Sequence, residues 1–240
     1  MRNWLILPVV ALSIGGTACS KRPEKLSAGD KDGIAKFLTA YQKTPFADRT
    51  TYVLDPVEFE KVQGTFYKGA APPPDEVRTV ITSVKPGPKA DYLTVMARYD
   101  VISNGKPATV EREQYLVNTR DGPKVDWAAN TGYNPAGFAA WAAGTDRELT
   151  LRVWAALSGY YKYQYEAAQG THFSLGLVEE LGDRGKSFNG YVLKDSDLGR
   201  RLFEIVRDGR PHKLVVTVER TGREVPVVGI KQLVGETWVR

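Results

Sequence analysis

The chain has 240 residues, of which 42% are hydrophobic and 25% are charged. These proportions are those of an ordinary globular protein and exclude a disordered chain. The net charge of +5 is spread evenly, because residues 19–145 hold 17 Lys and Arg against 15 Asp and Glu and residues 146–240 hold 15 against 13, so the broad basic surface of a nucleic-acid-binding protein is not expected.

The first 20 residues, MRNWLILPVVALSIGGTACS, have the pattern of an export signal. Arg2 supplies a positive start, residues 4–14 form an apolar run, and small residues at 15–18 precede Cys19. A charged start, a short apolar run and a small-residue cleavage site are typical of a secretory signal peptide. The apolar run is too short for a membrane-spanning helix, which needs roughly 20 residues. We therefore expect residues 1–18 to be removed on export.

Cys19 is the one cysteine of the chain and stands directly after the expected cleavage point. The segment resembles a bacterial lipoprotein signal, and this resemblance implies that Cys19 is acylated and becomes the new N-terminus. Acyl chains would hold the protein at the membrane, since each buried methylene contributes about 0.8 kcal/mol. Ser20 resembles the pattern that is sorted to an outer membrane. The alternative is an ordinary signal peptide cut near Ala18, which leaves Cys19 as a free thiol.

Beyond the signal, the sequence predicts a polar tether and two modules joined by a short helical linker. The first helix begins after Asp30 as N-cap and places Ile34 and Leu38 on an apolar face. The second begins with Asp55 as N-cap, followed by Pro56 at the first helical position. The predicted boundaries are 1–18 for the signal peptide, 19–29 for the tether, 30–133 for the first module, 134–148 for the linker and 149–240 for the second module.

Strands of the first module are predicted over residues 77–84, 92–102, 109–118 and 124–128. Asn104-Gly105 and Asp121-Gly122 are strong hairpin turns between them. Two helices followed by a long antiparallel meander resemble an α+β module of the nuclear-transport-factor-2-like (NTF2-like, or cystatin-like) class. The resemblance implies a curved sheet that packs against helices around a pocket. Some members of that class are isomerases, dehydratases or cyclases that use a carboxylate or histidine in the pocket.

Carboxylates of this module are the candidates for such a catalytic role, and they are Asp100, Glu111, Glu113 and Asp126. Glu111 and Glu113 are two residues apart and so share a strand face with Tyr115. The same spacing fits the solvated face of a half-exposed strand, which is the interpretation we favour. The module contains no histidine, which removes the usual general base at neutral pH. Trp127 is expected in the core.

The linker helix is predicted over residues 136–143, and from residue 149 the apolar pattern changes to a period of two. Leu149, Leu151 and Val153 predict a strand with one buried face, which we expect to continue through Gly159 to Tyr165. Further strands are predicted at 172–181, 188–194, 213–219 and 227–234, with a helix capped by Asp195 or Ser196 before the last two. This order, β-β-β-α-β-β, is that of an OB-fold-like five-stranded barrel with one helix. An SH3-like barrel is the alternative.

The candidate ligand-binding residues lie on the first strand of the barrel. Tyr161, Tyr163 and Tyr165 alternate and would share a face, as a stacking platform for bases or sugars requires. Trp154 lies on the other face of the same strand, together with Arg152. If the register of the strand continues unbroken, however, the three tyrosines fall on the buried side, and packing is the simpler interpretation.

No metal or cofactor site is predicted. His172 and His212 stand far apart in the sequence, at the starts of two predicted strands. The chain lacks a Ser-His-Asp set, a phosphate-binding glycine loop and the ligand spacing of a zinc site. We therefore expect a binding protein rather than an enzyme.

Short motifs along the mature chain resemble those of two-module bacterial envelope lipoproteins, namely Tyr52 to Pro56, Val125 to Trp127, Gly190 to Val192 and Trp238-Val239. The resemblance implies the architecture and leaves the activity open. We predict an exported lipoprotein, anchored to a bacterial membrane by its N-terminal lipid, that binds or scaffolds an envelope protein or a small ligand. Nucleic acid is not the expected partner. The alternatives are a small-molecule enzyme that uses the NTF2-like pocket, and oligonucleotide or glycan binding on the barrel.

Overall fold

The structure, a computed structural model, describes residues 25–66, 74–103, 105–179, 187–221 and 228–239. The predicted signal peptide and Cys19 lie outside these residues. The elements in chain order are α1 (Lys31–Lys43), η1 (Phe46–Tyr52), α2 (Pro56–Phe66), β1 (Glu76–Pro86), β2 (Tyr92–Ser103), β3 (Lys106–Thr119), β4 (Gly122–Val125), α3 (Trp127–Thr131), α4 (Phe138–Ala143), β5 (Glu148–Ser158), η2 (Tyr163–Tyr165), β6 (His172–Val178), β7 (Ser187–Leu193), α5 (Asp197–Val206), β8 (His212–Arg220) and β9 (Val228–Gly235).

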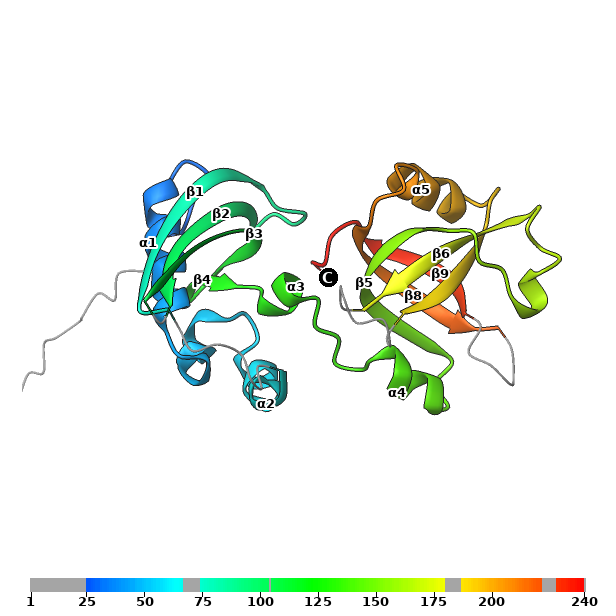
Figure 1. Cartoon of the computed structure of the whole chain (residues 1–240), viewed down its shortest axis with the longest axis horizontal. Helices are drawn as coiled ribbons and strands as arrows, with labels where there is room; N and C mark the ends of the chain where they lie inside the picture. The colour runs from blue at the N-terminus through cyan, green and yellow to red at the C-terminus, as the bar shows by residue number, and fades with distance from the viewer. Residues whose placement is uncertain (1–24, 67–73, 104, 180–186, 222–227, 240) are drawn as a thin grey trace, which may run out of the picture.

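The chain is an α+β protein with a four-stranded sheet and a five-stranded closed barrel, as the sequence predicts at this level. Figure 1 shows the sheet and the barrel side by side, with α3 between them. We call α1 through α3 the sheet unit, and β5 through the C-terminal residues the barrel unit. Among the described residues, no helix combines the length and the apolar character that crossing a membrane requires.

The two main helices of the sheet unit begin where the sequence predicts. Asp30 Oδ1 accepts a hydrogen bond of 2.8 Å from the backbone N–H of Gly33, which caps α1. Asp55 Oδ1 accepts one of 3.1 Å from the N–H of Glu58 at the start of α2. Both bonds satisfy N–H groups that the first turn of a helix leaves unpaired. Between the two helices lies η1, a 3-10 helix that the sequence patterns do not predict.

The sheet is an antiparallel meander in the order β1-β2-β3-β4. β2 pairs with both neighbours along nearly its whole length, whereas β4 pairs only with Leu116 to Thr119 of β3. The sequence predicts that the last strand continues to Ala128. This end is wrong, because β4 stops at Val125. The reason is Asp126, whose Oδ1 accepts a 3.0 Å hydrogen bond from the N–H of Ala129 and so starts α3.

Apolar side chains fill the space between the helices and the sheet. Trp127 is 1% exposed, and its ring meets the ring of Phe59 edge-on at a centroid distance of 5.3 Å. Around this pair lie further buried residues, which are Ile34, Leu38, Val53, Val95, Ala97, Leu116 and Val125. Trp127 is thus confirmed as a core residue. Burial of each large apolar side chain stabilises the fold by about 1.5–3 kcal/mol.

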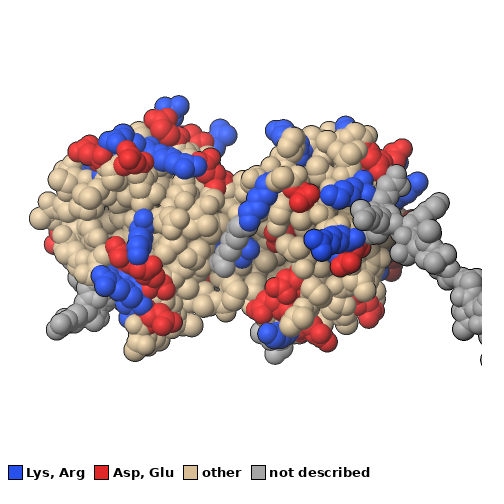
Figure 2. All heavy atoms as spheres, turned by 180° about the vertical axis from the view of Figure 1, so that it is seen from behind, with Lys and Arg blue, Asp and Glu red and all other residues tan. Residues whose placement is uncertain are grey.

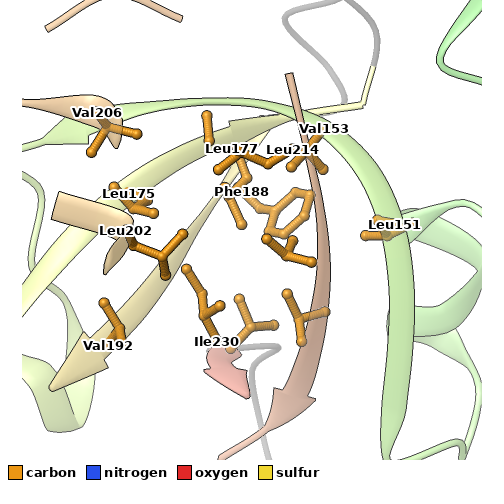
Figure 3. Close-up of a cluster of buried hydrophobic side chains, with 14 of the residues drawn as sticks. Leu151, Val153, Leu175, Leu177, Phe188, Val192, Leu202, Val206, Leu214 and Ile230 are labelled. Atoms are coloured by element: carbon orange, nitrogen blue, oxygen red, sulfur yellow. The ribbon is translucent and has the colours of Figure 1, made fainter. Parts of the chain in front are cut away.

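In the barrel, the strands follow one another in the order β5-β6-β7-β9-β8, and β5 pairs with β8 to close it. The β7–β9 pair is parallel and the other pairs are antiparallel. Figure 3 shows that apolar side chains from the strands and from α5 meet in the interior. The labelled ones are Leu151, Val153, Leu175, Leu177, Phe188, Val192, Leu202, Val206, Leu214 and Ile230. Because the barrel closes, each of its strands has a neighbouring strand on both sides, which limits edge-to-edge association.

The helix α5 is fixed against the end of β7. Of the two predicted caps the structure uses Ser196, whose Oγ accepts a 2.9 Å hydrogen bond from the N–H of Gly199. A Cβ atom at Gly199 would lie 1.9 Å from the carbonyl oxygen of Leu193. Only glycine permits this approach, which sets the path of the chain from β7 into α5.

The predicted continuation of β5 into the tyrosine run is wrong. β5 ends at Ser158, and residues 163–165 form the short 3-10 helix η2. The last residue pair between β5 and β6 is Ser158 with Ser174. Because β6 begins at His172, only two residues before Ser174, it cannot pair with a β5 that continues to Tyr165. The ring of Tyr165 instead stacks on that of Tyr191 in β7, at a centroid distance of 4.0 Å.

Candidate functional site

A set of contacts that we call the junction joins the sheet unit to the barrel unit. Its members come from the end of β3, from α3 and the residues after it, from β5 and β8, and from the C-terminal residues. They are Glu113, Tyr115, Ala129, Gly132, Tyr133, Asn134, Arg152, Trp154, Lys213, Trp238 and Val239.

Arg152 of β5 holds the centre of the junction. It stands on the outer face of the strand, as the alternating pattern predicts, yet it is only 6% exposed because the sheet unit covers it. Its Nε donates to the carbonyl oxygen of Trp238 and its Nη1 to that of Tyr133, both at 2.7 Å. The backbone N–H of Arg152 also donates to Asn134 Oδ1 at 2.7 Å. A planar guanidinium suits such a bridge, because it presents several donors in a fixed geometry.

Trp238 brings the C-terminus back between the two units, where Figure 1 places it beside α3. Its indole Nε1 donates to the carbonyl oxygen of Val153 at 3.0 Å, and its ring meets Trp154 edge-on at 5.1 Å. On the other side the indole lies against Gly132, where φ is +69° and an added Cβ would be 2.8 Å from the ring. The indole therefore fits only because position 132 has no side chain.

Lys213 of β8 forms the second link of the junction. Its Nζ donates to Glu113 Oε1 at 3.0 Å and lies over the rings of Tyr115, Trp154 and Trp238 at 5.1–5.6 Å from their centroids. The same carboxylate oxygen accepts a 2.5 Å hydrogen bond from the hydroxyl of Tyr115. A cation over aromatic faces is stabilised by their negative π-systems.

The carboxyl group of Glu113 is held in its charged form. Burial alone raises its pKa, but hydrogen bonds from Tyr115 and Lys213, with the charge of Lys213, outweigh burial and lower the pKa below its ordinary value of 4.5. Burial and the hydrogen bond to Glu113 raise the pKa of the Tyr115 hydroxyl, so that hydroxyl stays a proton donor. Glu113 is consequently a poor proton acceptor near neutral pH, where a general base needs a pKa close to the working pH.

Beside these contacts opens a cleft of about 380 Å³, which we call the junction cleft. Both units line it, with α1, η1, β3 and α3 on one side and β5, β8 and the C-terminus on the other. The lining residues are Tyr41, Gln42, Phe46, Arg49, Arg112, Glu113, Gln114, Asn130, Thr131, Trp154, Lys213 and Trp238. Its volume is in the range of small-molecule sites, roughly 300–1,000 Å³.

The polar wall of the junction cleft is fixed by its own hydrogen bonds. Asn130 Oδ1 accepts from the backbone N–H of Tyr115 at 2.7 Å, and Asn130 Nδ2 donates to Gln114 Oε1 at 2.9 Å. On the same side, in η1, Arg49 is 5% exposed and donates to the carbonyl oxygens of Thr44 and Gln42. Asn130, Gln114 and Arg49 are therefore held in place before any ligand arrives.

The charged residues in the described lining of the cleft are mainly cationic. Its lining carries three cationic side chains, Arg49, Arg112 and Lys213, against the single carboxylate of Glu113. Elsewhere positive and negative side chains are interspersed over both units on the face that Figure 2 shows, and the molecule narrows to a waist between the units. On this face the charges are mixed, whereas cations outnumber anions in the described lining of the cleft.

The structure separates the residues that were predicted to bind a ligand. Trp154 lines the junction cleft. Tyr165 is 9% exposed and stacks on Tyr191, and Tyr161 is half-buried and donates its hydroxyl to the carbonyl oxygen of His172 at 3.2 Å. The side chain of Tyr163 and the lipidation candidate Cys19 lie outside what the structure describes. The three tyrosines do not alternate along one strand as expected, because residues 163–165 form η2 and Tyr161 lies between β5 and η2. The packing of Tyr165 agrees with the simpler interpretation of the sequence.

The candidate carboxylates are spread over different places. Asp100 pairs with Arg98 on the sheet surface, and the exposed Glu111 accepts a hydrogen bond from Thr82. Asp126 caps α3 and accepts a 3.1 Å hydrogen bond from the hydroxyl of Tyr92. Glu113 is the one that lines the junction cleft.

The two histidines make separate contacts, His172 with Thr171 and His212 with Asp208. Within the described residues no group of three or more His, Cys, Asp and Glu side chains is arranged to hold a metal ion.

Of the residues that line the cleft, sequence reasoning singled out only Glu113 and Trp154 as site candidates. The charged and aromatic residues that it missed include Arg49, Arg112, Lys213 and Trp238. Arg49 lies in a 3-10 helix without apolar periodicity, and Lys213 stands at the start of a strand where a lysine is ordinary. Trp238 offered the one available signal, because a tryptophan beyond the last predicted strand needs a partner to cover its ring.

Comparisons with protein-family models, with curated proteins and with solved structures found no match to this chain. The junction cleft itself is therefore the basis for a functional proposal.

Proposed function

We propose that the protein is an exported lipoprotein, acylated at Cys19, that acts as a non-catalytic binding or scaffolding protein of the bacterial envelope. The proposed localisation rests on the first 20 residues, in which a short apolar run and small residues precede the one cysteine of the chain. Acylation places a folded protein on a membrane without a spanning helix.

We further propose that the sheet unit is an NTF2-like module and the barrel an OB-fold-like one. The first rests on two helices followed by an antiparallel meander with the chain order β1-β2-β3-β4. The second rests on the strand order β5-β6-β7-β9-β8, with α5 between β7 and β8. Both classes include ligand-binding proteins, which agrees with a binding role without identifying a ligand.

The junction cleft is the observation that carries the binding proposal. Two units contribute to it, and Arg152 and Trp238 pin those units together. A site whose lining is fixed in advance loses little conformational freedom on binding, which favours affinity. The enzyme alternative would place its acid or base in this cleft, where the lowered pKa of Glu113 suits electrostatic binding better than proton transfer. Oligonucleotide or glycan binding on the tyrosine run loses its support, because Tyr165 is buried against Tyr191.

Metabolic labelling tests the proposed acylation of Cys19 and the membrane localisation. In a diderm bacterium fed a palmitate analogue, we expect the wild-type protein to be labelled and to sediment with membranes. Cys19→Ala should be unlabelled and absent from the mature, membrane-bound fraction, whereas Ser27→Ala in the tether should behave as wild type. A labelled Cys19→Ala protein refutes the proposed anchor.

NMR of the tryptophan indole N–H groups tests the binding role. The membrane-purified protein is titrated with phenol, benzylamine, benzoate and phenyl phosphate. We expect at least one of these probes to shift the signals of Trp154 and Trp238 saturably, while that of Trp141, buried in the barrel core, stays in place.

Gln42→Phe narrows the cleft and should abolish the shifts, whereas Lys43→Phe, at the next and exposed position of α1, should keep them. If none of the four probes shifts either signal, the junction cleft is not a binding site and the proposal fails.

A further inference from the structure

Arg49 carries a buried charge that no acidic group compensates within the part of the chain that the structure describes. The residue is 5% exposed, and within the described residues no carboxylate forms an ion pair with it. Its guanidinium lies over the rings of Tyr41 and Phe46, 4.6 and 4.2 Å from their centroids, and donates to two backbone carbonyl oxygens. Removing a charge from water is costly unless an opposite charge and hydrogen bonds replace the lost solvation. Here only the hydrogen bonds and rings are present, and the residue faces the junction cleft.

Arg112 adds a second guanidinium to the same cleft. It follows Glu111 on β3 and opposes Ala97 of β2, so that its side chain leaves the sheet on the side of α1. The residue is exposed, and its charge lowers the pKa of the buried Tyr41 hydroxyl, whose net pKa is raised by burial. That influence shows that Arg112 acts on the same part of the cleft as Tyr41 and Arg49.

The remaining charges of the lining do not neutralise this pair. Among the described residues that line the cleft, Glu113 is the only carboxylate, and Tyr115 and Lys213 already occupy its Oε1. The lining therefore has two more cations than anions. Guanidinium groups bind carboxylate and phosphate in a bidentate way that gives both affinity and orientation.

Aromatic rings form the other part of the lining. Tyr41 and Phe46 come from the sheet unit, and Trp154 and Trp238 from the barrel unit. Sites for small organic molecules combine such apolar surfaces with a few placed polar groups. A volume of about 380 Å³ suits one small molecule.

We infer that the junction cleft binds a small organic anion, with its carboxylate or phosphate group at Arg49 and Arg112 and a flat apolar part against the tryptophan rings. The inference rests on the proposed function, because it names the ligand class of the same cleft. The anion supplies the opposite charge that Arg49 lacks, and the ring fills the space between the two units.

The four probes described above differ in charge and share a phenyl ring, so they test the inference directly. Dissociation constants are read from the indole signals of Trp154 and Trp238. We expect benzoate, phenyl phosphate or both to bind about tenfold or more tightly than phenol and benzylamine, as a charge-assisted contact implies. A preference for benzoate assigns a carboxylate ligand, and a preference for phenyl phosphate assigns a phosphate ligand.

Variants assign the contact to the cleft. Arg112→Gln should weaken the preferred anion about tenfold and leave phenol unchanged, because an exposed arginine is removed without disturbing a core. Arg120→Gln removes the same charge at an exposed turn outside the cleft and should change nothing. Inorganic phosphate should bind more weakly than phenyl phosphate, since it lacks the ring.

The outcomes separate the two claims. If phenol or benzylamine binds as tightly as the anions, the cleft is a binding site but the anion inference is wrong. Equal binding of the anions by wild type and Arg112→Gln also overturns it. If none of the four probes shifts the indole signal of Trp154 or Trp238, the proposed binding function itself is wrong.

Discussion

In the barrel unit every strand has a strand neighbour on both sides, whereas in the sheet unit β1 and β4 lie at the ends of an open sheet. The barrel closes on itself and fills its interior with aliphatic side chains such as Leu175 and Leu214. The open sheet cannot enclose its own core, so helices cover it and the large rings of Phe59 and Trp127 fill the space. The site lies outside both cores, where the end of β3 meets the outer face of β5. The comparison indicates that each core supplies stability while the contact between units supplies the site.

Core substitutions should have the largest effects and should separate the two units. Trp127→Ala removes a side chain that is 1% exposed, and the loss of a buried Trp costs roughly 3–5 kcal/mol of unfolding free energy. Leu175→Ala in the barrel should cost about 2–5 kcal/mol. Urea unfolding, followed by tryptophan fluorescence and circular dichroism, measures both.

In Trp127→Ala we expect the sheet unit to unfold at lower urea than the barrel, because the barrel keeps its own core. Val57→Ala, at a position that is 63% exposed, is the control and should stay within about 0.5 kcal/mol of wild type. A loss below about 1 kcal/mol in Trp127→Ala contradicts the packed core described for this unit.

Substitution of Arg152 in the junction should have the next largest effect on stability, because it leaves buried carbonyl acceptors without donors. Arg152→Met removes the donors to the carbonyl oxygens of Trp238 and Tyr133. Each buried acceptor left unpaired costs about 1–3 kcal/mol, so for two acceptors a total loss of about 2–6 kcal/mol is expected in urea unfolding. Arg152→Lys should rescue little, since an ammonium group lacks the fork that reaches both oxygens.

We also expect Arg152→Met to split one unfolding transition into two, since the units lose the link between them. Arg201→Met serves as the control, because that arginine pairs with Glu236 at the exposed surface of the barrel. A variant that unfolds like wild type would show that the junction does not couple the two units.

The smallest effect is expected at Glu113, and it should depend on pH. The pKa of this carboxyl group is lowered in the folded protein, so its charged form stabilises the fold above the ordinary pKa of 4.5. That contribution is lost as the pH falls through the lower folded pKa. Glu113→Gln should therefore be less stable than wild type by about 1 kcal/mol at pH 7, because the ion pair is partly exposed.

Urea unfolding of wild type and Glu113→Gln at several pH values checks this expectation. The difference between them should shrink towards zero as the pH falls well below 4.5. Glu111→Gln, on the same strand face but exposed, is the matched control. A difference that stays constant down to acid pH would mean that the charge of Glu113 does not matter.

Much of the secondary structure was predictable because it depends on local sequence patterns. Asp30, Asp55 and Ser196 cap helices where the sequence places them, since a cap depends on residues only a few positions away. Most strands also follow from periodicity and turn residues, and five strands form a closed barrel after a four-stranded sheet. The errors lie at strand ends, as at Val125 and Ser158, where a partner strand or a helix cap decides the length.

The site was predictable only in part. Trp154 was singled out from the strand pattern, and Glu113 from its position beside Tyr115. Their neighbours in space are Lys213 and Trp238, which lie far from them in the chain. No local pattern connects such distant positions.

The amino-acid sequence by itself determined which segments form helices and strands, which face of each is apolar, and how the barrel strands follow one another. Only the tertiary structure decided that the outer face of β5 is covered and that Trp238 returns to meet Gly132. It also decided that Arg49 and Lys213 line one cleft. The periodicity of apolar residues indicates which side chains are buried. Only the fold determines which distant residues cover them.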